Sequence, residues 1–180
     1  MRTGMMRRCG GMAPLCAALY LVSLTSLAVL ADASNFCVTA MNKKLCEETV
    51  KGAADWNQAI TKAVTIALKQ IEKVDHGQVK TSIHQTKSAS VGSAVDRMCT
   101  EAYANAKDLL QESLELIRNG DKTSSLNFKL SAALTSLEDC DNAFDDFKVD
   151  VASVQALNND IDQAIRVCLA VDKSKSAARK

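Results

Sequence analysis

Residues 95–116 read VDRMCTEAYANAKDLLQESLEL, and small or apolar side chains recur along them at steps of three and four. This spacing gathers one set of side chains on a single side of an α-helix, which indicates an amphipathic helix with a core-facing stripe. The predicted stripe consists of Val95, Cys99, Ala102, Ala106, Leu109, Ser113 and Leu116. The next turn, Asn119-Gly120-Asp121, has the chemistry of a helix end.

Three further segments show the same periodicity. The first begins at Asp55, which can cap a helix, and its first break is predicted in the polar residues 81–90. The others cover residues 126–147 and 154–169. Four amphipathic helices joined by short polar loops predict an all-α fold, namely an antiparallel four-helix bundle over residues 55–172. We expect a short helical hairpin over residues 34–54 before the bundle and a disordered basic tail over residues 173–180.

The first 33 residues have the features of a secretory signal peptide. Basic residues precede an uncharged apolar run over residues 13–30, and small residues then form a signal-peptidase site. We expect cleavage after Ala33, with cleavage after Ala31 as the alternative. The competing interpretation is an uncleaved membrane anchor, but the adjacent cleavage site and the polar chain beyond it favour removal. The mature chain is therefore predicted to be secreted and not held in a membrane.

Five of the seven cysteines remain after this cleavage: Cys37, Cys46, Cys99, Cys140 and Cys168. In an oxidising secretory compartment they are expected to form disulfides and not to bind a metal. The residues alone leave several pairings open, although a short local loop favours Cys37 with Cys46. If Cys99 pairs with Cys140, two helices are tied together and Cys168 is the odd thiol.

The features of an enzyme are missing from the sequence. The two histidines, His76 and His84, have no cysteine or glutamate at metal-ligand spacing, and we expect both to be exposed. Cys168 has apolar helical neighbours, which favours an inert thiol. The acidic residues between 138 and 150 lack the loop pattern of a calcium site. We therefore expect no catalytic residue, no metal and no cofactor, and the lack of a sustained basic face argues against nucleic acid.

Two segments resemble a known family of secreted inhibitors. The segment CTEAYANAKDLL at residues 99–110 is similar to the C-x-x-x-Y-x-x-A-x-x-x-L motif of the plant invertase and pectin methylesterase inhibitors. The segment SAALT at residues 131–135, followed by Cys140 and Phe144, is similar to that family's second cysteine segment. With the Asn119-Gly120-Asp121 turn and the remaining cysteines, the resemblance covers essentially the whole mature chain.

This resemblance implies a four-helix bundle with disulfides Cys37–Cys46 and Cys99–Cys140 and with Cys168 free. It also implies an inhibitor that binds one-to-one to pectin methylesterase, or alternatively to a cell-wall or vacuolar acid invertase, and blocks the active-site cleft. Its location would be the apoplast, or the vacuole. Positions beside the third and fourth family cysteines contribute to binding, so the candidate contact residues are Glu101, Asn105, Asp108, Asp139 and Asn142.

The sequence departs from the family pattern at two places. The loop between Cys37 and Cys46 lacks the usual proline, and Asp139 stands where the family often has threonine. There is also no Pro-Lys-Phe triplet, a feature associated with some invertase inhibitors, so pectin methylesterase is favoured as the target. A secreted helical binding protein without inhibitory activity is the further alternative.

Overall fold

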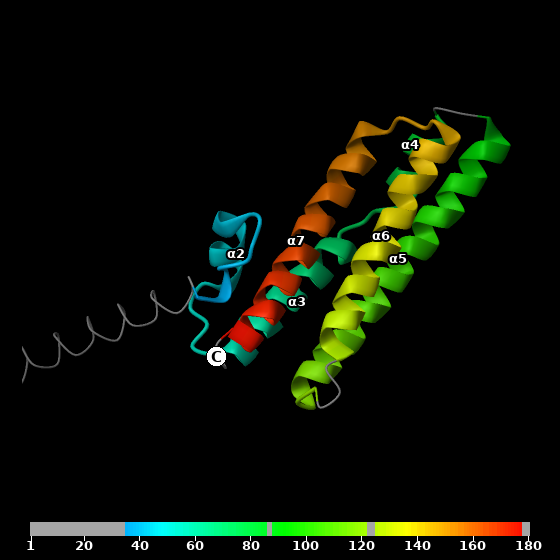
Figure 1. Cartoon of the computed structure of the whole chain (residues 1–180). Helices are drawn as coiled ribbons and strands as arrows, with labels where there is room; N and C mark the ends of the chain where they lie inside the picture. The colour runs from blue at the N-terminus through cyan, green and yellow to red at the C-terminus, as the bar shows by residue number, and fades with distance from the viewer. Residues whose placement is uncertain (1–34, 86–87, 122–124, 178–180) are drawn as a thin grey trace, which may run out of the picture.

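The computed structural model describes residues 35–85, 88–121 and 125–177, arranged as Figure 1 shows. Within these ranges every regular element is a helix, which confirms the predicted fold class. The helices are α2 (Lys43–Val50), α3 (Trp56–Glu72), α4 (His76–His84), α5 (Ala89–Arg118), α6 (Ser125–Phe147) and α7 (Ala152–Ala177). The predicted signal peptide and residues 178–180 of the predicted tail lie outside the described residues.

The bundle consists of two neighbouring helix pairs. Figure 1 shows α5 beside α6 and α3 beside α7, with the small α2 on the outer side of α7. Helices α6 and α7 bring the two pairs together, and α3 also packs against α5. The core is largely aliphatic, as predicted, and it surrounds two fully buried rings, Tyr103 and Phe144.

The N-terminal arm is closed by its own disulfide and is linked to the bundle by a hydrogen bond. Cys37 and Cys46 are bonded, with Cα atoms 5.8 Å apart, which confirms this pairing. The hydroxyl of Thr39 donates to the carbonyl oxygen of Ala170 in α7 over 3.4 Å. Asn35 and Phe36 are helical, residues 37–39 form a turn, and α2 follows from Lys43.

The segment predicted to be the first helix of the bundle forms two helices, α3 and α4, and not one. Asp55 caps α3 as predicted, since its carboxylate accepts a hydrogen bond from the amide of Gln58 over 2.8 Å. The chain then breaks after Glu72, well before the predicted break at residues 81–90. Asp75 causes this difference, because its carboxylate accepts from the amide of Gln78 and caps the new helix α4.

The predicted turn at Asn119-Gly120-Asp121 is confirmed in detail. Gly120 has a positive φ of 70°, and its amide donates to the carbonyl oxygen of Ile117. The amide of Asp121 donates to the carbonyl oxygen of Leu116 over 2.8 Å, which completes a Schellman motif. The Asp121 carboxylate then accepts from the amides of Ser125 and Leu126 at the start of α6. One turn therefore ends α5, starts α6 and sets the two helices antiparallel.

Residues 173–177, predicted to be disordered, instead continue α7. Contacts with Trp56 explain this extension. The indole nitrogen of Trp56 donates to the carbonyl oxygen of Val171 over 2.9 Å, and the Lys175 ammonium lies 3.8 Å from the centre of the Trp56 ring. The last turns of α7 are thus tied to the start of α3.

Candidate functional site

The register of α5 against α6 is fixed at two points. The disulfide Cys99–Cys140, which the structure confirms, joins the helices with Cα atoms 4.4 Å apart. Nearer the connecting turn, Lys129 of α6 forms an ion pair with Glu112 of α5. Every α-helix rises by the same distance per residue, so two antiparallel helices keep the alignment that these two links set. This alignment places Glu101 level with Asp139. The outer surface of α5 and α6 is therefore one continuous face.

All five candidate contact residues are exposed on this outer surface. Glu101, Asn105 and Asp108 are spaced by four and three residues and so form one stripe of α5. Asp139 and Asn142 are three residues apart on the exposed side of α6. We call these five residues the α5/α6 face. Three of them are carboxylates and two are amides, and one of the carboxylates, Glu101, forms an ion pair with Arg97 one turn away on α5.

Behind this face lies a buried polar cluster that the sequence analysis missed. Asn158 of α7 is fully buried, and its side-chain oxygen accepts a hydrogen bond from the Tyr103 hydroxyl over 2.6 Å. Its amide nitrogen donates to Asp141 Oδ1, also over 2.6 Å, and lies 3.5 Å from Cys140 Sγ. These contacts join α5, α6 and α7 next to the disulfide. Burial raises the pKa of the Tyr103 hydroxyl, and the Asp141 charge raises it further.

The comparison with protein families now identifies the chain. Residues 31–171 match the family described as plant invertase/pectin methylesterase inhibitor. The chain belongs to this inhibitor family. A comparison with curated proteins finds no match. Members of this family are inhibitors of invertase or pectin methylesterase and are not enzymes themselves. The target of this chain is therefore one of these two enzymes. No described helix is long and apolar enough to cross a membrane, and the family is typically secreted to the apoplast.

Three side chains of types that enzymes often use, namely Cys168, His76 and His84, lie outside the α5/α6 face. Cys168 is a fully buried free thiol whose pKa is raised by burial, so it holds its proton. His76 is exposed and meets the edge of the Tyr103 ring at 5.9 Å between centroids. His84 was expected to be exposed, and that prediction is wrong. It is half-buried because α4 packs closely on α5, where an added Cβ at Gly92 would lie 3.1 Å from His84 Nδ1.

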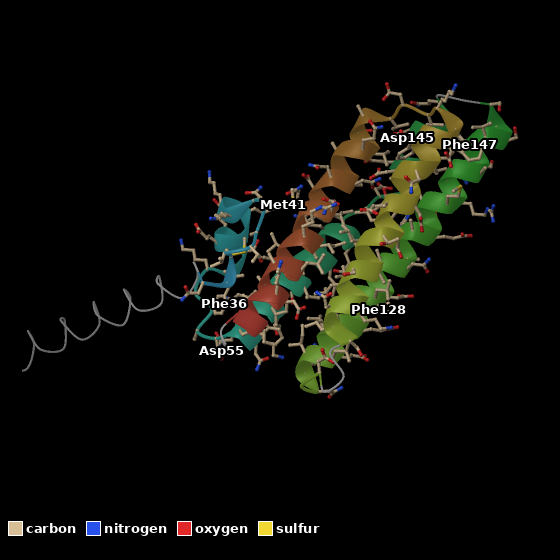
Figure 2. The ribbon with its side chains drawn as sticks, viewed as in Figure 1. Phe36, Met41, Asp55, Phe128, Asp145 and Phe147 are labelled. Carbon is tan, nitrogen blue, oxygen red and sulfur yellow. A yellow bond between two sulfur atoms is a disulfide. The ribbon has the colours of Figure 1, made fainter. Side chains whose placement is uncertain are left out.

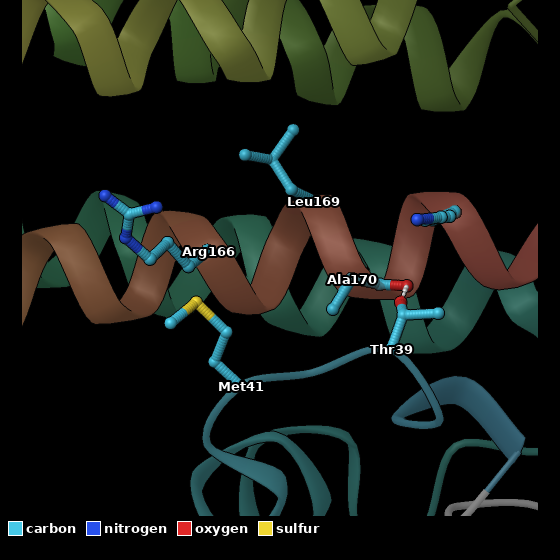
Figure 3. Close-up of a pocket in the computed structure, with 6 residues that line it drawn as sticks. Thr39, Met41, Arg166, Leu169 and Ala170 are labelled. Atoms are coloured by element: carbon cyan, nitrogen blue, oxygen red, sulfur yellow. Dashed lines mark hydrogen bonds between the residues drawn. The ribbon is translucent and has the colours of Figure 1, made fainter.

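Two open pockets lie away from the α5/α6 face. One, of about 190 Å³, lies between the N-terminal arm and α7, and Figure 3 shows Met41 and Leu169 at its wall. The other, of about 260 Å³, lies between α4 and the start of α7 and is lined mainly by polar side chains. The second pocket has Ser82 and Ser153 in its lining together with Asp75 and Lys73. Among the described residues no hydrogen bond joins either serine to these groups, so the pocket shows no activated nucleophile.

The polar cluster predicts a pH dependence of stability. Burial is the largest cause that raises the pKa of Asp141 in the folded protein, and the charges of Asp162 and Asp145 add to it. A carboxyl with a raised folded pKa gives stability that is complete below its unfolded pKa, near 3.8, and is lost as the pH rises through the folded pKa. We expect the contribution of Asp141 to the free energy of unfolding to decrease as the pH rises above about 3.8 and through the folded pKa.

Urea unfolding across this pH range measures the effect. Asp141→Asn keeps an oxygen that can accept from Asn158 but cannot ionise, so its stability should decline less with rising pH than that of the wild type. Asp160→Asn, at an exposed position on the same α7 helix as Asn158, is the control and should keep the wild-type slope. An unchanged slope in Asp141→Asn would contradict the assignment.

Proposed function

We propose that the mature chain inhibits a pectin methylesterase by forming a one-to-one complex in which the α5/α6 face covers the active-site cleft. The observation that carries the proposal is the joint exposure of the five face residues on two helices locked by the Cys99–Cys140 disulfide. A protein of this family needs no chemistry of its own to block an enzyme. It needs a rigid surface that fits the cleft.

Rigidity supports this mode of binding. An interface that is already ordered loses little conformational freedom on association, so more of the contact energy appears as affinity. Three links spaced along the helix axes connect α5 to α6: the disulfide, the Lys129–Glu112 ion pair and the turn at Asp121. The buried Asn158 holds α7 behind them.

The charge of the face favours pectin methylesterase over invertase. The product of pectin demethylation is an acidic polysaccharide, and a cleft that holds such a polymer benefits from cationic groups. Glu101, Asp108 and Asp139 present carboxylates of the same sign as that polymer. Sucrose, the substrate of invertase, is neutral. The missing Pro-Lys-Phe triplet points in the same direction.

The proposal includes secretion. Removal of residues 1–33 in the secretory pathway exposes the chain to oxidising conditions, in which its two disulfides form. The apoplast is the proposed destination, with the vacuole as the alternative. Mass spectrometry of the protein purified from plant tissue tests this, since cleavage after Ala33 gives a chain that begins at Ser34.

Titration of the oxidised mature protein into a plant pectin methylesterase and, separately, into an acid invertase tests the target. We expect loss of pectin methylesterase activity at micromolar inhibitor, and light scattering should give the mass of a one-to-one complex. Inhibition of invertase alone would reject the proposed target. Inhibition of neither enzyme would reject the inhibitor function.

A charge reversal on the face tests where the enzyme binds. Asp139→Arg should weaken inhibition about 10-fold or more, because it places a cation against the cationic lining proposed for the cleft. The matched control is Asp160→Arg, which makes the same change at an exposed position on α7. Equal inhibition constants for the two variants would show that the α5/α6 face is not the contact.

A further inference from the structure

Phe128, the more exposed of two exposed phenylalanines on α6, has no evident role in folding. Phe128 is 71% exposed, although it lies on a helix whose neighbouring residues Leu126 and Leu130 are buried in the core. Figure 2 marks its position on the α5/α6 pair, far from the exposed Met41 of the N-terminal arm. Since water covers most of this ring, it adds little to the stability of the folded chain.

The structure presents the ring on a rigid support. Its helical neighbours three and four residues away are Ser125, Ser131 and Ala132, which are too small to cover it. The backbone of this first turn of α6 is held by the Asp121 carboxylate, and the adjacent Lys129 is paired with Glu112. An exposed aromatic ring on a fixed backbone is the usual form of an anchor residue in a protein interface.

The ring also lies in line with the α5/α6 face. Phe128 precedes Thr135 by seven residues and Asp139 by eleven, and all three are exposed. These spacings place them on one stripe of α6, with Phe128 about 16 Å along the axis from Asp139. The stripe therefore has an apolar ring at one end and the Asp139 carboxylate at the other.

We infer that Phe128 is the apolar anchor of the inhibitor and that it docks on a sugar subsite of the pectin methylesterase cleft. This inference rests on the proposed function. Pyranose rings have apolar C–H faces, and ligand sites bind apolar faces with aromatic and aliphatic side chains. A phenyl ring can occupy such a subsite by stacking, while the Asp139 carboxylate of the same stripe meets a cation further along the cleft. The stripe thus presents an apolar ring and a negative charge, which are the two features of an acidic polysaccharide.

Inhibition measurements on Phe128 variants test this role. Phe128→Ala should weaken the inhibition of pectin methylesterase by about 30-fold or more, as truncation of an interface anchor does. Phe128→Trp should inhibit within a few-fold of the wild type, because it keeps an aromatic ring. The melting temperature of both variants should match that of the wild type, since the side chain is mostly exposed.

Met41→Ala is the matched control, because it truncates an 87% exposed apolar side chain on the N-terminal arm and should leave inhibition unchanged. If the wild type inhibits but Phe128→Ala inhibits equally well, the anchor role is overturned and the proposed function stands. If Phe128→Ala and Met41→Ala weaken inhibition equally, the anchor role is also overturned. If the wild type does not inhibit, the proposed function fails and this inference fails with it.

Discussion

Replacing Cys99 and Cys140 together by alanine is expected to lower the free energy of unfolding by about 4 kcal/mol. The bond closes a loop with a sequence separation of 41 residues, so its loss releases a large amount of chain entropy in the unfolded state. Small domains have total stabilities of about 5–15 kcal/mol, so this change removes a large part of the total. Guanidinium unfolding at fixed pH measures it.

The second disulfide provides the comparison. Loss of Cys37–Cys46, with a sequence separation of 9, should lower the stability by only about 3 kcal/mol. Loss of Cys99–Cys140 should also weaken enzyme inhibition more, because that bond lies under the α5/α6 face whereas Cys37–Cys46 lies in the N-terminal arm. If loss of the shorter loop were the more damaging change for both measurements, the role assigned to Cys99–Cys140 would be wrong.

The helices themselves were largely predictable, but the core register along α5 was predicted with a drift. The predicted stripe includes Leu109 and Leu116, which the structure leaves half-buried, whereas Leu110 and Ile117 are buried. Alternating steps of three and four give a 3.5-residue period, and a straight helix with 3.6 residues per turn departs from it by about 20° per heptad. The error is small near Cys99 and grows to about 60° three heptads after Val95, where Ile117 is buried in place of Leu116.

Local capping chemistry was predicted well in two places and missed in a third. Asp55 and the Asn119-Gly120-Asp121 turn were identified because each follows or precedes a clear periodic run. Asp75 was missed because buried apolar residues, Val74 and Val79, lie on both sides of it and continue the pattern across the break. Hydrophobic spacing alone cannot separate one long helix from two helices that pack against the same core.

The candidate face was found through the resemblance, while the groups that support it were not. Asn158 has the spacing of a core residue, four after Val154 and three before Ile161, and both of these are buried. Its polarity favours an exposed position, since buried amides are uncommon. Its partners Tyr103 and Asp141 come from other helices, so only the folded structure shows that its hydrogen bonds are satisfied.

Asn158→Leu is expected to lower the free energy of unfolding by about 3 kcal/mol. Leucine has the same branched arrangement of side-chain heavy atoms as asparagine and a larger volume, so the substitution leaves no cavity and the loss comes mainly from the unpaired partners. Without the amide, the Tyr103 hydroxyl and the Asp141 carboxylate lose hydrogen bonds inside the protein, and each such loss costs about 1–3 kcal/mol. Urea unfolding measures the change. The matched control, Asn159→Leu at the exposed next position, should change the stability by less than about 0.5 kcal/mol.

A double-mutant cycle decides whether the cluster acts as one unit. Tyr103→Phe removes only the hydroxyl that donates to Asn158, so it leaves the buried ring in place. Because the two side chains are hydrogen-bonded, the double variant with Asn158→Leu should be less destabilised than the sum of the two single changes by about 1 kcal/mol. Strictly additive losses would mean that the two side chains stabilise the bundle independently. In that case Asn158 would not tie α7 to α5, and the support proposed behind the inhibitor face would have to come from the disulfide and the apolar core alone.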